Sequence, residues 1–144
     1  MSNGVLCAID ISSDDQDAHV LKVAIQQASL RGTHLDVMTV LPDYGLSLVG
    51  SYFDKNQHAK VEENAKDLLS EVVARHTENK QNPETRAVVA TGSVYEQVLQ
   101  LAKTTKCALI VIGAHRPELS DYLLGPNAAR IVRHSHCSVY VVRD

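Results

Sequence analysis

Long apolar runs are missing from this chain of 144 residues. The longest run, CALIVIGA from Cys107, is far shorter than the roughly 20 residues that a transmembrane helix needs, so we expect no membrane span. The first residues, MSNGVLCAID, contain no basic segment, no long apolar region and no small-residue cleavage site. Because such segments direct export, their absence makes a cytoplasmic location the expectation.

Cysteine is scarce, and basic residues form no dense block. Three cysteines without a CxxC spacing predict neither a disulfide framework nor a zinc site, so Cys7 and Cys107 are expected to be buried thiols. His115, His134 and His136 lack ligand spacing with an acidic or cysteine partner, so no metal site is expected. A net charge of -3 without a Lys/Arg cluster argues against nucleic-acid binding.

Motifs of covalent and general-base catalysis are absent as well. The chain contains no G-x-S-x-G elbow, no Walker lysine and no pair of carboxylates at a convincing spacing. The sequence therefore favours a binding or interaction protein over an enzyme.

Apolar runs and helical spacings alternate along the chain. Short apolar runs predict strands at residues 4–10, 34–41, 86–92, 108–113 and 138–143, and the first of them is expected to be central and covered on both faces. Helical spacing predicts helices at residues 18–31, 61–73, 93–102 and 127–135, the first ended by Gly32. Residues 43–57 have weak periodicity and are expected to form a partly ordered loop or lid. A capping box of Ser93 and Glu96 is expected to open the third helix, and Asn127 to cap the fourth.

Strands that alternate with helices predict a doubly wound (Rossmann-like) α/β domain over residues 1–144. Each helix can act as a right-handed crossover, which gives a five-stranded parallel sheet with helices on both faces. In such a sheet the ligand crevice lies at the carboxyl ends of the strands, where the winding direction reverses. We therefore expect a site built from the loops after the first, second and fourth strands.

The chain resembles the universal stress proteins over nearly its whole length. The resemblance is carried by CAIDIS, MTVLP, TGSVYEQVLQLA and VIGAHRPELSDYLLGPNAARIVRHSHCSVYVVR, and the last stretch is similar to the F/G-type branch of bacteria. It implies a parallel five-stranded sheet, a homodimer or dimer of dimers through the last strand, and in many members ATP binding.

The resemblance also implies a nucleotide loop of the form G-x-x-G, nine residues, G, then Ser or Thr. Gly113 matches the first glycine, His115 follows it, and Arg116 stands at the second glycine. Gly125 matches the third glycine after eight intervening residues, and Pro126 replaces the hydroxyl residue. Pro126 removes an N–H and a hydroxyl that could hold phosphate. Arg116 offers charged donors to phosphate, or else narrows the groove that a glycine leaves open.

The base-binding half of the site is carried over by resemblance to four residues. Asp10 would face the ribose or base, as a strand-end carboxylate near the surface, and Ala8 stands in the place of a family proline. The backbone of Val40 would read the adenine edge, and Ile112 would pack on the ring. Short apolar side chains and main-chain groups form a suitable slot for a flat ring.

Each of these residues also has a purely structural interpretation. Asp10 could cap the loop ISSDD, and Gly113 and Gly125 would suit any tight turn after a strand. Asn127 and Ser120 could touch phosphate oxygens or serve as cap and loop residues. The sequence thus predicts a regulator that binds ATP, ADP or AMP, with or without Mg²⁺, and hydrolyses ATP slowly and incidentally at most. The alternative is a nucleotide-free module of the same fold that acts through its dimer face.

Overall fold

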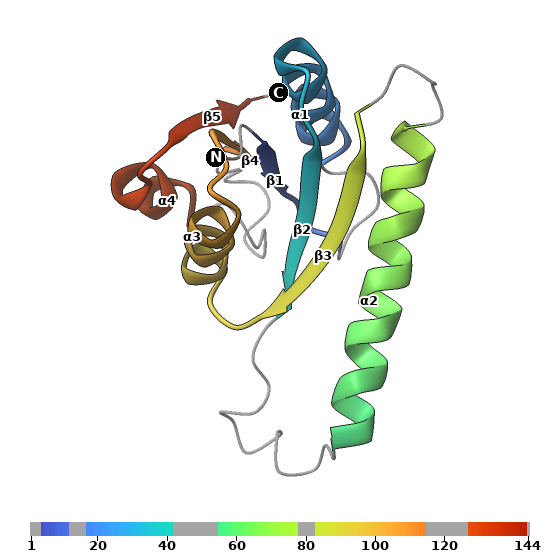
Figure 1. The fold of residues 1–144 in the computed structure, drawn as a ribbon. Helices are drawn as coiled ribbons and strands as arrows, with labels where there is room; N and C mark the ends of the chain where they lie inside the picture. Colours follow the sequence, from blue (N-terminus) through green and yellow to red (C-terminus); the bar gives the residue numbers. More distant parts are fainter. Residues whose placement is uncertain (1–3, 12–16, 42–54, 78–82, 115–126, 144) are drawn as a thin grey trace.

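The computed structural model describes residues 4–11, 17–41, 55–77, 83–114 and 127–143. Strands and helices alternate along the chain, as the sequence predicts (Figure 1). They are β1 Val5–Ala8, α1 Ala18–Arg31, β2 Leu35–Leu41, α2 Lys55–His76, β3 Thr85–Thr91, α3 Val94–Thr105, β4 Leu109–Gly113, α4 Ala128–His134 and β5 Ser138–Val142.

The strands form one parallel sheet in the order β3-β2-β1-β4-β5. α1 and α2 cover one face of the sheet, and α3 and α4 cover the other (Figure 1). The predicted doubly wound fold is therefore confirmed, with β1 at its centre. That residues 1–144 make up a single domain stays a prediction.

Each face of the sheet has its own apolar core. Val5, Cys7 and Ile9 contribute to the core beneath α1 and α2, whereas Leu6 and Ala8 contribute to the core beneath α3 and α4. Successive side chains of a strand point to opposite faces, so a strand covered on both sides must be apolar throughout. This explains why β1 is a continuous apolar run, and Cys7 is the buried thiol that the run predicts.

The helices follow the predicted pattern at most positions. Gly32 ends α1 in the left-handed conformation (φ +62°), which glycine adopts at little cost. α2 starts at Lys55, inside the stretch that the sequence suggests is a loop, and its N-terminal part extends past the end of β3 (Figure 1). Val61 and Leu68 of α2 are 39% and 52% exposed, since only one side of the helix faces the sheet. No helix within the described residues has the length and apolarity to cross a bilayer.

The two predicted caps are not formed by side chains. Ser93 occupies the N-cap position of α3 but makes no capping hydrogen bond, so the predicted capping box is wrong. Glu96 instead accepts a hydrogen bond from the hydroxyl of Tyr95, with an O–O distance of 3.3 Å. Asn127 precedes α4 with helical backbone angles (φ -89°, ψ -18°), whereas a capping residue is usually extended, and its side chain does not cap either.

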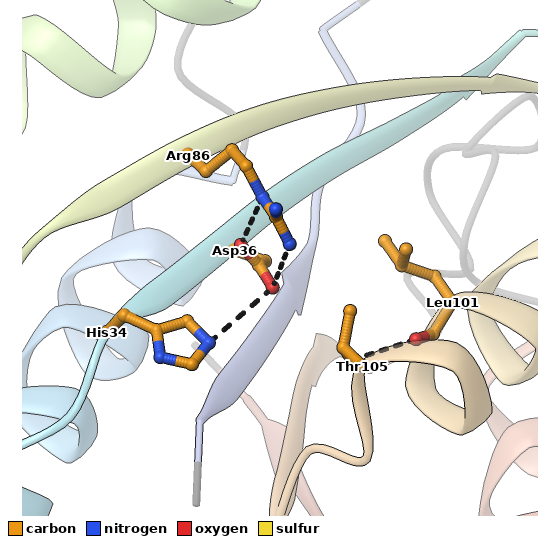
Figure 2. A network of polar contacts seen from close by, with 5 residues as sticks. All are labelled: His34, Asp36, Arg86, Leu101 and Thr105. Atoms are coloured by element: carbon orange, nitrogen blue, oxygen red, sulfur yellow. Dashed lines mark hydrogen bonds and ion pairs between the residues drawn. The ribbon is translucent and has the colours of Figure 1, made fainter. Parts of the chain in front are cut away.

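A buried carboxylate ties β2 to β3. Asp36 is 2% exposed and accepts two hydrogen bonds from Arg86, its paired residue on β3 (Figure 2). The donors are Nε at 2.9 Å and Nη2 at 3.1 Å. His34 Nε2 lies 3.9 Å from the same carboxylate. The bidentate pair of Asp36 and Arg86 fixes the register of β2 and β3 as well as their contact.

Figure 2 also shows the C-terminal turn of α3, where the Thr105 hydroxyl donates to the Leu101 carbonyl at 2.8 Å.

β5 lies at one edge of the sheet. Its Val142 carbonyl accepts a hydrogen bond from the Ala114 N–H at 2.9 Å, which places the Val142 peptide on the β4 side. Because backbone direction alternates along a strand, the N–H and C=O groups of Val139 and Val141 point away from β4. This edge therefore presents a row of outward-facing backbone groups, flanked by the exposed side chain of Tyr140.

Removing Arg86 should destabilise the protein more than neutralising Asp36 does. Arg86→Ala leaves a carboxylate in the core and should lower the free energy of unfolding by about 2–4 kcal/mol. Asp36→Asn leaves only a guanidinium whose side chain is 64% exposed and can hydrate, so we expect a loss of about 1 kcal/mol. Urea denaturation measures both variants, with Arg133→Ala, at an exposed position of α4, as the control. Equal losses for the two variants would contradict this account.

Candidate functional site

The winding of the sheet reverses between β1 and β4. β1 continues through α1 to β2 on one side, whereas its neighbour on the other side is β4, about a hundred residues later in the chain. In open sheets of this class such a reversal is where a ligand crevice is expected, at the carboxyl ends of the strands. The sequence predicts the site at this point of the fold.

The turn after β1 is closed by two buried acidic residues. Asp10 lies two residues beyond the end of β1, and its backbone N–H donates to Asp17 Oδ2 at 2.7 Å. Asp10 is 5% exposed and Asp17 is 3% exposed, so the expectation that Asp10 lies near the surface is wrong. Asp17 occupies the N-cap position of α1 but makes no capping hydrogen bond there, because its carboxylate reaches back to the turn.

Asp17 is a residue of the site that the sequence does not single out. It is one of several polar residues in the segment before α1, all of which could have capped the helix. Its burial and its hydrogen bond to the β1 turn appear only in three dimensions. Burial, and secondarily the nearby charge of Asp17, raises the pKa of the Cys7 thiol, so Cys7 stays protonated inside the core.

Three of the predicted residues come together at the ends of neighbouring strands. Ala8, Val40 and Ile112 belong to one buried cluster beneath α3 and α4, with their side chains almost wholly covered. The last β1–β2 pair is Ala8 with Met38, so Val40 extends two residues past the end of the ladder.

The backbone of Val40 points toward the end of β1. The Met38 carbonyl accepts from the Ile9 N–H at 2.9 Å, and the Leu41 carbonyl accepts from the Gly92 N–H on the other side, also at 2.9 Å. By alternation the Val40 peptide groups point toward β1, where no described residue of that strand is paired with them. Main-chain groups of this kind are available to orient a ligand.

The loop side of the site is described only at its two ends. Gly113 is the last residue of β4, and Asn127 stands directly before α4. His115, Arg116, Gly125 and Pro126, together with the alternative contact Ser120, lie outside the described residues.

A cavity of about 690 Å³ lies at the opposite end of β4, away from the predicted site. It is lined by the end of α3, the start of β4 and the turn between α4 and β5, and it contains none of the predicted nucleotide contacts. Within the described ranges, no three His, Cys, Asp or Glu side chains are arranged to hold a metal ion.

The sequence and the fold were compared with those of known proteins. A sequence model described as the universal stress protein family matches residues 1–143. Universal stress protein G of Shigella flexneri is 32% identical over 91 residues, which are 63% of this chain and 60% of that protein, so the match spans less than two thirds of that relative. Universal stress protein A homolog 1 of Coxiella burnetii is 30% identical over 141 residues, covering 96% of this chain and 94% of that protein.

Solved structures of low sequence identity share the fold. The universal stress protein of Archaeoglobus fulgidus in complex with dAMP superposes with a TM-score of 0.64 at 18% identity, covering 96% of this chain and 95% of that one. A universal stress protein in complex with cAMP superposes with a TM-score of 0.68 at 19% identity, covering 97% and 96%.

The matches to universal stress protein G agree with the predicted F/G-type branch. A parallel sheet in the order found here, and a family sequence model that is matched from the first residue to the last but one, make this chain a member of the universal stress protein family.

Proposed function

We propose that the chain binds an adenine nucleotide at the carboxyl ends of β1 and β4 and acts as a regulator in a stress response. The observation that carries this proposal is the position of the Val40 backbone, which points into the crevice beyond the last β1–β2 pair. Family members of the same fold have been solved with dAMP and with cAMP, both adenine nucleotides.

The described groups suit the base and ribose better than the phosphates. An adenine edge needs one donor and one acceptor in fixed positions, which the N–H and C=O of a single strand residue such as Val40 supply. Asp10 stands next to this position at the end of β1, and a carboxylate there can accept hydrogen bonds from ribose hydroxyls. The ring would lie against the strand ends, because the side chains of Ala8 and Ile112 are already covered.

The phosphate groups of the nucleotide would be bound by the segment between Gly113 and Asn127. There Arg116 brings a charged donor, whereas Pro126 brings neither an N–H nor a hydroxyl. We therefore propose that ATP, ADP and AMP bind with little discrimination, and that Mg²⁺ accompanies only the polyphosphates.

We propose that the protein regulates its partners by binding the nucleotide and not by hydrolysing it. Efficient phosphoryl transfer needs groups that position the attacking water and neutralise the phosphates. The sequence has no Walker lysine to take the second of these roles, so any hydrolysis of ATP would be slow and incidental.

A second candidate function is a nucleotide-free interaction module. It is favoured by the open edge of β5, where the backbone groups of Val139 and Val141 point outward. Pairing of this edge with the same strand of a second chain would satisfy those groups around a two-fold axis. Nucleotide released from heat-denatured protein in near-stoichiometric amount favours the first candidate. Its absence, together with no thermal shift on adding ATP, favours the second.

Asp10→Asn should weaken adenine-nucleotide binding by about tenfold or more, because the amide loses the charge that attracts ribose hydroxyls. The backbone hydrogen bond from residue 10 to Asp17 is retained, so the melting temperature should change by only a few degrees. Calorimetric titration with ATP measures the affinity, and Asp67→Asn on the exposed side of α2 is the matched control. A variant that binds ATP normally but melts far below wild type would show that Asp10 has only a structural role.

Pro126→Ser should sharpen the preference for ATP over AMP by about tenfold, since a hydroxyl and an N–H become available to phosphate oxygens. Titrations of each variant with both nucleotides give the ratio. Pro83→Ser, at the amino end of β3, should leave the ratio unchanged. If wild type already prefers ATP by more than about a hundredfold, ~2.7 kcal/mol, the argument about Pro126 is wrong.

Val141→Pro should shift a β5-paired dimer toward monomer, because it removes a donor that points away from β4. Light scattering at tens of micromolar measures the change. Leu68→Ser alters an exposed side chain on the far helix α2 and should leave the assembly intact. A wild-type protein that is strictly monomeric at this concentration would overturn pairing through β5.

A further inference from the structure

Two of the three cysteines lie side by side although they are far apart in the sequence. The Sγ atoms of Cys107 and Cys137 are 4.0 Å apart, although the two residues are 30 positions apart along the chain. Cys107 follows Lys106, whose left-handed backbone (φ +53°) ends α3 and turns the chain toward β4. Cys137 directly precedes β5, the neighbour of β4 in the sheet. The two cysteines thus stand just before two paired strands, where their sulfur atoms meet, and both are free thiols.

The segment around Cys137 is held by Ser135. The Ser135 Oγ accepts from the Cys137 N–H at 3.1 Å and donates to the Cys137 carbonyl at 2.9 Å. The same oxygen lies 3.3 Å from the Cys137 Sγ. The position of Cys137 is therefore fixed by its own turn as well as by the strand that follows.

The geometry is close to that of a disulfide. Adjacent strands lie about 4.8 Å apart, and disulfides join Cα atoms separated by about 4.4–6.8 Å. Closing the sulfur–sulfur distance from 4.0 Å to about 2.05 Å requires side-chain rotation and little backbone movement. Both residues line the 690 Å³ cavity, and the half-buried Cys137 is the more exposed of the two. A small oxidant therefore has a path to the pair.

We infer that Cys107 and Cys137 are a dithiol that hydrogen peroxide converts to an intramolecular disulfide. In the first step the sulfur of Cys137, as thiolate, attacks one peroxide oxygen. The O–O bond breaks, hydroxide leaves and takes up a proton to form water, and Cys137 becomes a sulfenic acid. In the second step the Cys107 sulfur attacks the Cys137 sulfur, the S–O bond breaks, and hydroxide departs with the Cys107 proton as water. One peroxide is reduced to two waters while two thiols lose two electrons.

The order of the two steps follows from the surroundings of each sulfur. Burial, and secondarily the charge on neighbouring Cys137, raises the pKa of Cys107 to about 12, so Cys107 remains a thiol. Cys137 is the more exposed of the two sulfurs, so peroxide reaches it first. Cys107 then acts as the resolving residue. Cys7 is fully buried in the other core and should stay reduced.

The disulfide would tie the end of α3 to the start of β5. It closes a loop of the chain that contains β4 and α4, and such a closure lowers the conformational entropy of the unfolded state. The melting temperature should therefore rise by roughly 5–10 °C on oxidation.

The test uses the full chain, reduced and then treated with a small excess of hydrogen peroxide. We expect intact mass to fall by about 2 Da, a cross-linked peptide that joins Cys107 to Cys137, and the rise in melting temperature. Reduction should reverse all three changes. A wild-type protein that keeps both thiols, forms only links between chains, or gains oxygen without an internal link would overturn the proposal.

Three variants separate the roles. Cys107→Ser should stop at a sulfenic acid on Cys137 that a dimedone probe captures, and Cys137→Ser should resist peroxide. Cys7→Ala is the matched control and should form the disulfide at the wild-type rate. Peroxide reactivity that survives in Cys137→Ser but vanishes in Cys107→Ser would reverse the assignment and overturn the proposed order.

Discussion

Burial of β1 on both faces is the constraint on which the rest of the structure depends. A strand of four residues with no exposed side chain is stable only if strands flank it and helices cover both its faces. Because β2 lies on one side and β4 on the other, the chain must reverse its winding at β1. The crevice at its carboxyl end is thus a consequence of the same packing that stabilises the core.

The same constraint explains why polar groups gather at that end. β1 stops at Ala8 while β2 runs on to Leu41, so the backbone of Val40 has passed its last partner. Beyond β1, the carboxylate of Asp17, directly before α1, accepts a hydrogen bond from the N–H of Asp10. A buried carboxylate is costly unless it is hydrogen-bonded. The turn is therefore specified by polar contacts where the apolar strand ends.

Sequence patterns predict the elements and their order well, since apolar periodicity is set by burial in the sheet and helices. They fail where a contact depends on register or on a competing partner. Ser93 and Glu96 have the spacing of a capping box, but Glu96 contacts Tyr95 instead. The pairing of Asp36 with Arg86 joins residues fifty positions apart and follows only from the β2–β3 register. The burial of Asp10 cannot be read from the sequence for the same reason, because its partner Asp17 lies seven positions away, directly before α1.

The cysteine pair and the proposed nucleotide site lie at opposite ends of β4. Cys107 precedes the strand and Gly113 ends it, and every residue of β4 is buried. A strand packed on both faces is close to rigid, so a disulfide at the amino end of β4 would not shift its carboxyl end. Any coupling would pass through β5, whose first residue follows Cys137 and whose Val142 peptide pairs with Ala114 next to Gly113. β5 is also the open edge of the sheet. Oxidation of the two cysteines would therefore alter the surface available to a second chain before it altered the proposed nucleotide site.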